Sequence, residues 1–162
     1  MRAWVFGDDI DTDVLAPGRY MKLGIEEIAG HCLEAVSSAF SNEVKPGDFV
    51  VAGRNFGCGS SREQAPAALK HLGVAALVAE SFAGLFYRNA LNLGLPALVC
   101  DGAGRIRNGD ALEIDYDKSE IVNLTLHQTL AFEPIPAHLM EMVRDGGLLP
   151  HLEKRLKCRT TS

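Results

Sequence analysis

The stretch FVVAGRNFGCGSSREQAP (residues 49–66) decides how this chain folds, because it joins a strand, a turn and the start of a helix. Its first four residues are apolar and favour β-structure, which predicts a buried strand over 49–52. Three glycines lie within residues 53–59. Glycine adopts positive φ and lets other atoms approach the backbone closely, so this segment is typical of a ligand-binding loop.

A helix is expected directly after the glycine-rich loop. The helical pattern runs to about Leu72 and is stopped by Gly73. Pro66 fits the first turn of a helix but not its interior. The helix should therefore begin nearer Gln64 than Ser60.

Working outward, the central part of the chain alternates between strand and helix patterns. The expected elements are a strand at 3–6, a helix at 25–40, a strand at 74–79, a helix at 82–93 closed by Gly94, and a strand at 95–100. Strands that alternate with helices form βαβ units. A partly parallel sheet flanked by helices is therefore expected.

The last third of the sequence has a different character. Short antiparallel strands are expected there, at residues 111–115, 121–126 and 129–132. A final helix over about 136–144 should end at Gly146-Gly147, and a short basic tail begins at about residue 154. No linker divides the chain, so we expect one mixed α/β domain over residues 1–162.

Composition excludes several classes of protein. The chain has 162 residues, 47% hydrophobic, and a net charge of −5 without a block of like charge. The tail from Lys154 to Arg159 is the one basic cluster, and a solvated helix end explains it better than nucleic acid does. No run approaches the roughly 18 apolar residues of a membrane span, and the N-terminus lacks a secretory pattern. We expect a cytoplasmic protein that binds neither nucleic acid nor membranes.

The four cysteines predict no metal site on this chain. Cys32, Cys58, Cys100 and Cys158 lie far apart and form no C-x-x-C pair. Neither a zinc ribbon nor a ferredoxin-like cluster site is visible, and a disulfide framework is not expected in a cytoplasmic chain. Cys58 is interpreted as a small side chain packed in the loop.

The glycine-rich loop predicts an anion site. A strand that leads into a helix start is where open α/β sheets bind anions, and Arg62 adds a fork that fits a carboxylate. A P-loop would need a lysine, and a dinucleotide fingerprint would need glycine where Arg62 stands. The structural alternative is a capping box, with Ser60 as N-cap and Glu63 three residues later.

A second polar cluster, GDDIDTD (residues 7–13), contains four aspartates. An EF-hand would need a glycine and a distal glutamate in its loop, whereas Val14-Leu15 follow here. A calcium loop is therefore not supported. The structural alternative is a solvated turn after a strand.

Four stretches resemble one known family. They are GDDIDTDVLAPGRY (7–20), GDFVVAGRNFGCGSSREQAP (47–66), SFAGLFYRNALNLGLP (81–96) and, more weakly, DGGLLPHL (145–152). In order and spacing they resemble the small subunits of 3-isopropylmalate dehydratases, which are the detached swivel domain of the aconitase family. The resemblance implies the swivelling β/β/α fold of that family.

The resemblance also implies roles for particular residues. Ser60 matches the catalytic base, which removes a proton from the carbon beside a carboxylate. Arg62 matches an arginine that binds a substrate carboxylate, and Asp13 matches an aspartate that orients neighbouring groups. Ser61 is expected to contact substrate, and only the family pattern separates it from Ser60 as the base. Gly84 departs from that pattern, and inside a helix a glycine would cost about 1 kcal/mol relative to alanine.

The resemblance assigns the loop Tyr20-Met21-Lys22-Leu23 to the variable end of the substrate. The residues of this loop leave the identity of the substrate open. Aliphatic contacts from Met21 and Leu23 would suit an isopropyl group. Lys22 could instead pair the extra carboxylate of a homocitrate-type acid, although an exposed lysine normally faces solvent. The alternatives are a homoaconitase small subunit and a methylmalate- or dimethylmalate-type dehydratase.

The implied enzyme is a hydro-lyase that isomerises 2-isopropylmalate and 3-isopropylmalate by dehydration and rehydration, in leucine biosynthesis. The family draws its Lewis acid from a 4Fe–4S cluster. Since no three-cysteine ligand set exists here, the cluster is expected on a large-subunit partner, in a heterodimer or heterotetramer that acts on a small hydroxy-dicarboxylic or tricarboxylic acid. The alternative from another functional class is a non-catalytic anion-binding module.

Overall fold

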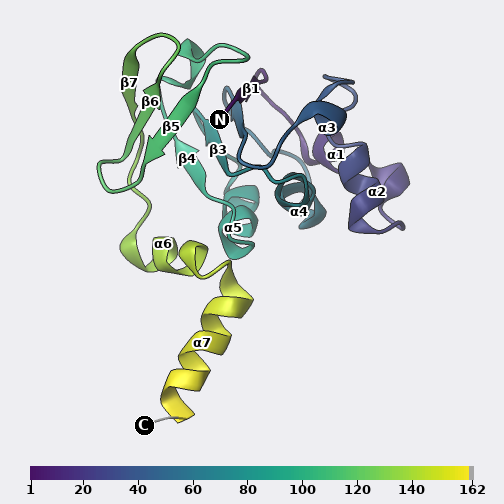
Figure 1. The fold of residues 1–162 in the computed structure, drawn as a ribbon. Coiled ribbons are helices and arrows are strands. Elements are labelled where there is room, and N and C mark those ends of the chain that lie inside the picture. The colour runs from purple at the N-terminus through teal and green to yellow at the C-terminus, as the bar shows by residue number, and fades with distance from the viewer. Residues whose placement is uncertain (161–162) are drawn as a thin grey trace.

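A four-stranded parallel sheet forms the centre of the computed structural model, which describes residues 1–160. The strands lie in the order β1-β2-β3-β4 and every neighbouring pair is parallel. Their bounds are β1 Ala3–Val5, β2 Phe49–Ala52, β3 Ala76–Ala79 and β4 Ala97–Val99. The expected parallel sheet is confirmed (Figure 1).

The parallel sheet is buried on both faces, which explains why its strands are continuous apolar runs rather than alternating ones. All four residues of β2 are buried, and so are all four of β3. On one face, Val50 and Leu77 join a core formed with the helices. On the other, Phe49 and Val78 join a core formed with the second sheet.

That second sheet is antiparallel and has the strand order β5-β6-β7. Its strands are β5 Leu112–Asp115, β6 Glu120–Asn123 and β7 Gln128–Ala131. Leu112, Ile121 and Leu130 pack into the core shared with the parallel sheet. The result is a layered arrangement of antiparallel sheet, parallel sheet and helices, which confirms the expected β/β/α fold.

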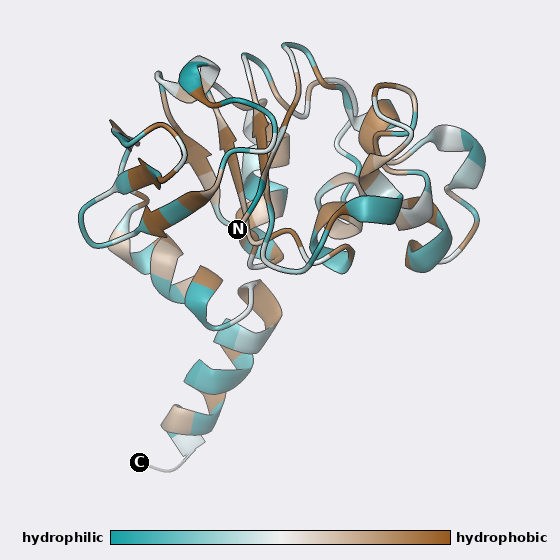
Figure 2. Ribbon diagram, turned by 45° about the horizontal axis from the view of Figure 1, so that its top comes forward, coloured by the Kyte–Doolittle hydropathy of each residue, from teal (hydrophilic) through white to brown (hydrophobic). Residues whose placement is uncertain are grey.

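The helices lie between the strands and after them. Their bounds are α1 Thr12–Leu15, α2 Ile25–Gly30, α3 Phe40–Glu43, α4 Gln64–His71, α5 Gly84–Asn92, α6 Ala137–Arg144 and α7 Leu148–Thr160, with short 3-10 turns at Gly18–Tyr20 and Ala103–Arg105. Figure 2 shows hydrophobic strands at the centre, while α7 projects away from them. None of the helices within residues 1–160 is long and apolar enough to cross a membrane.

Two local expectations were wrong. The single helix over 25–40 is instead α2 and α3 with turns between them, because Leu33 adopts a φ of 61°. The amide of Leu33 donates to the carbonyl of Val14 at 3.0 Å, so a tertiary contact replaces the helical bond. The capping box is also absent, since α4 begins at Gln64 and its N-cap, Glu63, makes no side-chain capping bond.

The basic tail from Lys154 to Arg159 is the exposed last part of α7, a helix of 13 residues, as expected of a solvated helix end. Gly84 is the first residue of α5 rather than an interior one, so its cost in the helix is smaller than expected.

Substitution of two glycines tests the packing that places the loop. Gly57 has a φ of 80°, and a Cβ there would lie 2.1 Å from Cγ of Phe86. We expect Gly57→Ala to lower the free energy of unfolding by about 2–4 kcal/mol, through the positive φ and the overpacking together. Denaturant unfolding followed by circular dichroism measures the change.

The matched control is Gly84→Ala. A Cβ at Gly84 meets no atom within 4 Å, and the residue opens a helix. We expect this change to be neutral or to stabilise the protein by about 0.4–1 kcal/mol. Equal effects of the two substitutions would contradict the packing argument.

Candidate active site

The glycine-rich loop after β2 lies beside the N-terminal acidic segment. Gly57 donates its amide to the carbonyl of Ile10 at 2.7 Å, and Thr12 donates its amide to the carbonyl of Cys58 at 2.8 Å. Asp11 and Cys58 form a parallel bridge. Segments more than 40 residues apart in the sequence are thereby held in register.

Side chains strengthen this pairing at the start of the loop. Asp8 accepts a hydrogen bond from the amide of Arg54 at 2.7 Å. Asn55 donates from Nδ2 to Asp9 at 2.9 Å. A Cβ on Gly53 would come within 1.9 Å of Asp8 Oδ1, so only glycine allows Asp8 to approach.

The aspartates of residues 7–13 therefore hold protein groups rather than forming a solvated turn. Asp11 is the N-cap of α1 and accepts from the amides of Asp13 and Val14 at 2.5 and 3.3 Å. An N-cap aspartate satisfies free amides and complements the helix dipole. The capping aligns Thr12 and Asp13 toward the glycine-rich loop.

Thr12 and Ser60 form a close hydroxyl pair. Their side-chain oxygens are 3.1 Å apart, and Thr12 Oγ1 also accepts the amide of Ser60 at 3.1 Å. Thr12 is buried, with 2% of its surface exposed, whereas Ser60 is open to solvent. Either hydroxyl can be the donor in this pair, and Thr12 Oγ1 can donate to Ser60 Oγ while it accepts the Ser60 amide.

Arg62 and Asp13 form the second pair of the site. Arg62 Nη1 donates to Asp13 Oδ1 at 2.6 Å and to the carbonyl of Ala16 at 3.0 Å. Asp13 Oδ1 also accepts the amide of Gly18 at 2.9 Å. A guanidinium has five N–H donors, so the contacts of Nη1 leave donors for a ligand carboxylate.

The pKa of Asp13 is lowered from its ordinary value of 3.8. The hydrogen bond from Arg62 is the largest cause, and the amide of Gly18 is the next. Both favour the charged carboxylate. Asp13 is therefore an anion that fixes the direction of the Arg62 side chain.

The loop Tyr20-Met21-Lys22-Leu23 begins at the last residue of the 3-10 turn Gly18–Tyr20. Tyr20 and Met21 pack partly against the helix-side core and keep part of their side-chain surface exposed. Lys22 is exposed, and 49% of Leu23 is exposed. Lys22 and Leu23 are thus the two most exposed side chains of this loop.

Polar and aromatic contacts hold Tyr20, the first residue of this loop. The ring of Tyr20 stacks on His31 with centroids 3.7 Å apart, and the guanidinium of Arg19 lies 4.8 Å from the Tyr20 ring centroid. Glu34 pairs with both Arg19 and His31. Arg19 and Glu34 also line a cavity of about 340 Å³ that reaches Asp13.

The structure thus places Ser60 against Thr12, and Arg62 against the adjacent Asp13. Ser61 lies beside them, exposed, and its carbonyl accepts a long hydrogen bond from Asn89 at 3.5 Å. The residue that sequence reasoning missed is Thr12. Its signal was a threonine between two aspartates, but its hydroxyl pairs with Ser60 only through the tertiary fold.

The cysteines are not arranged as ligands of a metal cluster. Cys32 and Cys100 are buried, and Cys58 is half-buried in the loop. Burial raises the pKa of the Cys58 thiol, and the nearby Asp11 and Asp9 raise it further. Within residues 1–160, the one side-chain group with metal-ligand spacing is Glu141, Asp145 and His151, which contains no cysteine.

The layered fold and the paired loops define an aconitase-type swivel domain. The Aconitase C-terminal domain family matches residues 15–101. The chain is 51% identical over 149 residues to "3-isopropylmalate dehydratase small subunit 1" of Archaeoglobus fulgidus, covering 91% of this chain and 92% of that one. It is 46% identical to the "Methanogen homoaconitase small subunit" of Methanothermobacter thermautotrophicus, covering 96% and 91%.

A solved structure agrees with these sequence relatives. The crystal structure of 3-isopropylmalate dehydratase from Methanocaldococcus jannaschii matches with a TM-score of 0.94 and 44% identity, covering 99% of this chain and 96% of that one. The chain belongs to the aconitase C-terminal domain family, among the small subunits of its dehydratases.

The pair of Arg62 and Asp13 can be tested in the isolated chain. We expect Arg62→Gln to raise the pKa of Asp13 toward 3.8, because it removes the largest cause of the lowered value. In the native protein the pair contributes to the free energy of unfolding at pH values above 3.8, the ordinary pKa. This contribution is lost as the pH falls through the lowered pKa of Asp13. A pH titration of the Asp13 carboxyl carbon by NMR measures the shift.

The matched control is Arg54→Gln. Arg54 is 73% exposed in its side chain and pairs with Asp8 and Glu80 rather than Asp13. An Asp13 titration that moves as much in this control as in Arg62→Gln would show that general charge, not the pair, sets the pKa.

Proposed function

We propose that this chain is the small subunit of an iron–sulfur hydro-lyase that interconverts 2-isopropylmalate and 3-isopropylmalate by dehydration and rehydration. The observation that carries the proposal is the presence of two adjacent polar pairs, Thr12 with Ser60 and Asp13 with Arg62. The first pair suits proton transfer and the second suits carboxylate binding. The relatives named as 3-isopropylmalate dehydratase small subunits support the same reaction.

In the dehydration direction, Ser60 is proposed to take a proton from the carbon next to a substrate carboxylate. Serine is far too weak an acid to ionise unaided near neutral pH, and each pKa unit requires about 1.36 kcal/mol of differential interaction. A hydrogen bond from Thr12 to the Ser60 oxygen would stabilise the alkoxide directly. In rehydration the same oxygen would return the proton.

Arg62 is proposed to hold the substrate carboxylate beside Ser60. Its planar fork matches a carboxylate in two parallel hydrogen bonds. Asp13 would restrain the guanidinium and spare the substrate the cost of ordering it. Such positioning increases the rate, because it places the reacting carbon against the base before the reaction begins.

Departure of the hydroxyl group requires a Lewis acid, which a 4Fe–4S cluster with an open iron supplies in this chemistry. The cysteines here do not fit a cluster, since no group of three potential ligand side chains within residues 1–160 contains a cysteine. We therefore propose that a large subunit carries the cluster and completes the site. The assembly would be a heterodimer or a heterotetramer and would be active only when both subunits are present.

We propose isopropylmalate as the substrate, because Leu23 offers an exposed apolar contact at the loop. The relative named as a homoaconitase small subunit supports a homocitrate-type acid as the alternative substrate. Lys22 would then pair with the extra carboxylate of that acid. A methylmalate-type acid is the third candidate.

Replacement of Ser60 tests its role as the base. We expect Ser60→Ala to leave assembly with the large subunit intact and to lower kcat by about 10²–10⁴-fold, the usual contribution of a positioned base. The measurement is an anaerobic assay of the reconstituted enzyme with 3-isopropylmalate. Ser61→Ala is the control, and a larger loss in that variant would move the role to Ser61.

Replacement of Lys22 tests substrate choice. The wild-type enzyme is offered 3-isopropylmalate and a homocitrate-type acid side by side, and we expect a higher kcat/KM for 3-isopropylmalate. Lys22→Met should then change that value by less than about threefold, since the amine would pair with no substrate group. A preference for the tricarboxylic acid that Lys22→Met abolishes would instead support the homoaconitase alternative.

A further inference from the structure

The last helix, α7, has no buried residue. α7 projects away from both sheets in the two views of the fold (Figures 1 and 2). Its 13 residues make a helix about 20 Å long. Isolated helices of this length are marginally stable in water, and helices in proteins depend mostly on packing of an apolar face.

α7 carries such a face, and it is uncovered. The face consists of Leu148, Leu149, Leu152 and Leu156, which are exposed to 37%, 73%, 44% and 61%. At 100° per residue, these positions fall within an arc of about 100° on one side of the helix. We call these four residues the leucine stripe.

Positive charge borders the leucine stripe. Arg155 and Arg159 line a cavity of about 250 Å³ together with Leu152 and Leu156. α7 carries four basic side chains against one acidic side chain, in a chain whose net charge is −5. The matching surface is therefore an apolar groove with carboxylates along one edge.

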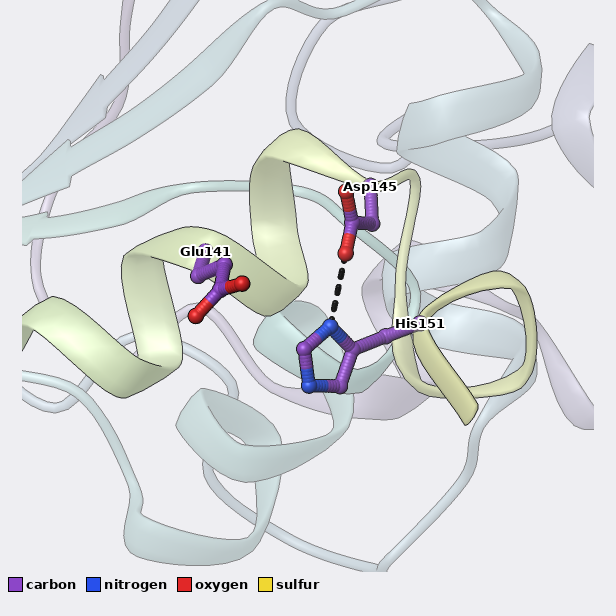
Figure 3. Close-up of side chains that lie close together, drawn as sticks. All are labelled: Glu141, Asp145 and His151. Carbon is purple, nitrogen blue, oxygen red and sulfur yellow. Dashed lines mark hydrogen bonds and ion pairs between the residues drawn. The ribbon is translucent and has the colours of Figure 1, made fainter. Parts of the chain in front are cut away.

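The direction of α7 is fixed at its root. The carboxylate of Asp145, at the end of α6, lies 2.7 Å from Nδ1 of His151 (Figure 3) and accepts from Lys154 Nζ at 2.8 Å. These bonds lower the pKa of Asp145, with that from Lys154 the largest cause. Although Glu141 lies close by, the ammonium of Lys154 already neutralises Asp145, so the group joins two helices rather than holding a metal ion.

The leucine stripe is continuous with the candidate active site. A cavity of about 260 Å³ is lined by Glu63 and Asn89 on one side and by Leu148 and Leu149 on the other. Glu63 follows Arg62 in the chain, and Asn89 donates to the carbonyl of Ser61. A partner that covers the Ser60 loop therefore reaches the start of α7 without crossing other surface.

We propose that α7 is a docking helix for the large subunit, which receives the leucine stripe in an apolar groove edged by carboxylates that face Arg155 and Arg159. The inference rests on the proposed function, because that function requires a large subunit over the Ser60 loop. Buried leucines would hold the complex, and the arginines would speed association and set its orientation. The fixed root lowers the cost of ordering the helix on binding.

The test is the affinity of the reconstituted complex. Isothermal titration calorimetry of the chain with the cluster-bearing large subunit, under anaerobic conditions, gives Kd. We expect the double substitution Leu149→Ser and Leu152→Ser to raise Kd at least about tenfold. The control is Leu124→Ser in the turn between β6 and β7, which removes a leucine whose exposure of 43% is close to the 44% of Leu152, and should leave Kd within about twofold.

A charge variant gives an independent reading. Arg155→Glu should slow association and weaken its dependence on salt, whereas a purely apolar contact would leave the association rate unchanged. Circular dichroism and the urea midpoint verify folding, which these exposed substitutions should not disturb.

Two results would overturn the docking inference. An unchanged Kd in the leucine double variant is the first. The second is a leucine variant that disrupts only self-association of the isolated chain, because a second copy would then be the occupant of the stripe. Failure of the wild-type chain to bind any large subunit would overturn the proposed function as well, so the two failures are distinguishable.

Discussion

The site depends on backbone hydrogen bonds between the N-terminal segment and the glycine-rich loop. The bonds from Gly57 to Ile10 and from Thr12 to Cys58 fix the register of two chain segments. In this register the hydroxyl of Thr12 faces Ser60, and the carboxylate of Asp13 faces Arg62. A shift by one residue would separate both pairs at once. Gly53 is needed because a Cβ there would lie 1.9 Å from Asp8 Oδ1, in the space through which the two segments approach.

Two side chains of the candidate site are exposed, but residues that hold the loop are buried. The aromatic ring of Phe86 packs against Gly57, and the buried Thr12 accepts the amide of Ser60 in the loop. Ser60 and Asp13 themselves remain exposed. The groups that would act on substrate are thus held by buried neighbours while they face an open surface. Such a surface suits half of a composite active site, in which the second half arrives with another subunit.

Ion pairs also restrain side chains on this surface. Arg62 is restrained by Asp13, and the Arg19–Glu34–His31 network supports the loop that presents Lys22 and Leu23. The exposed ion pairs contribute little to stability. Their effect is to limit the orientations of groups on the face that a ligand or partner would meet. α7 extends this face with apolar and positive side chains, so the catalytic and docking proposals concern one continuous surface.

Much of the fold followed from local patterns in the sequence. The apolar run of β2, the glycines after it and the position of Pro66 determined a strand, a loop and a helix starting at Gln64, because each depends on neighbours within a few residues. Alternating strands and helices likewise indicated the parallel sheet. Resemblance to a family, rather than periodicity, selected Ser60, Arg62 and Asp13.

Tertiary structure decided what depends on contacts distant in sequence. Leu33 left the helical conformation because its amide bonds to Val14, and no local pattern records that bond. Thr12 became the partner of Ser60 because strand pairing brings together residues 48 positions apart. The leucine spacing of α7 was present in the sequence, but its exposure was not. A stripe of leucines is buried or uncovered according to what packs against it, and only the folded chain determines that.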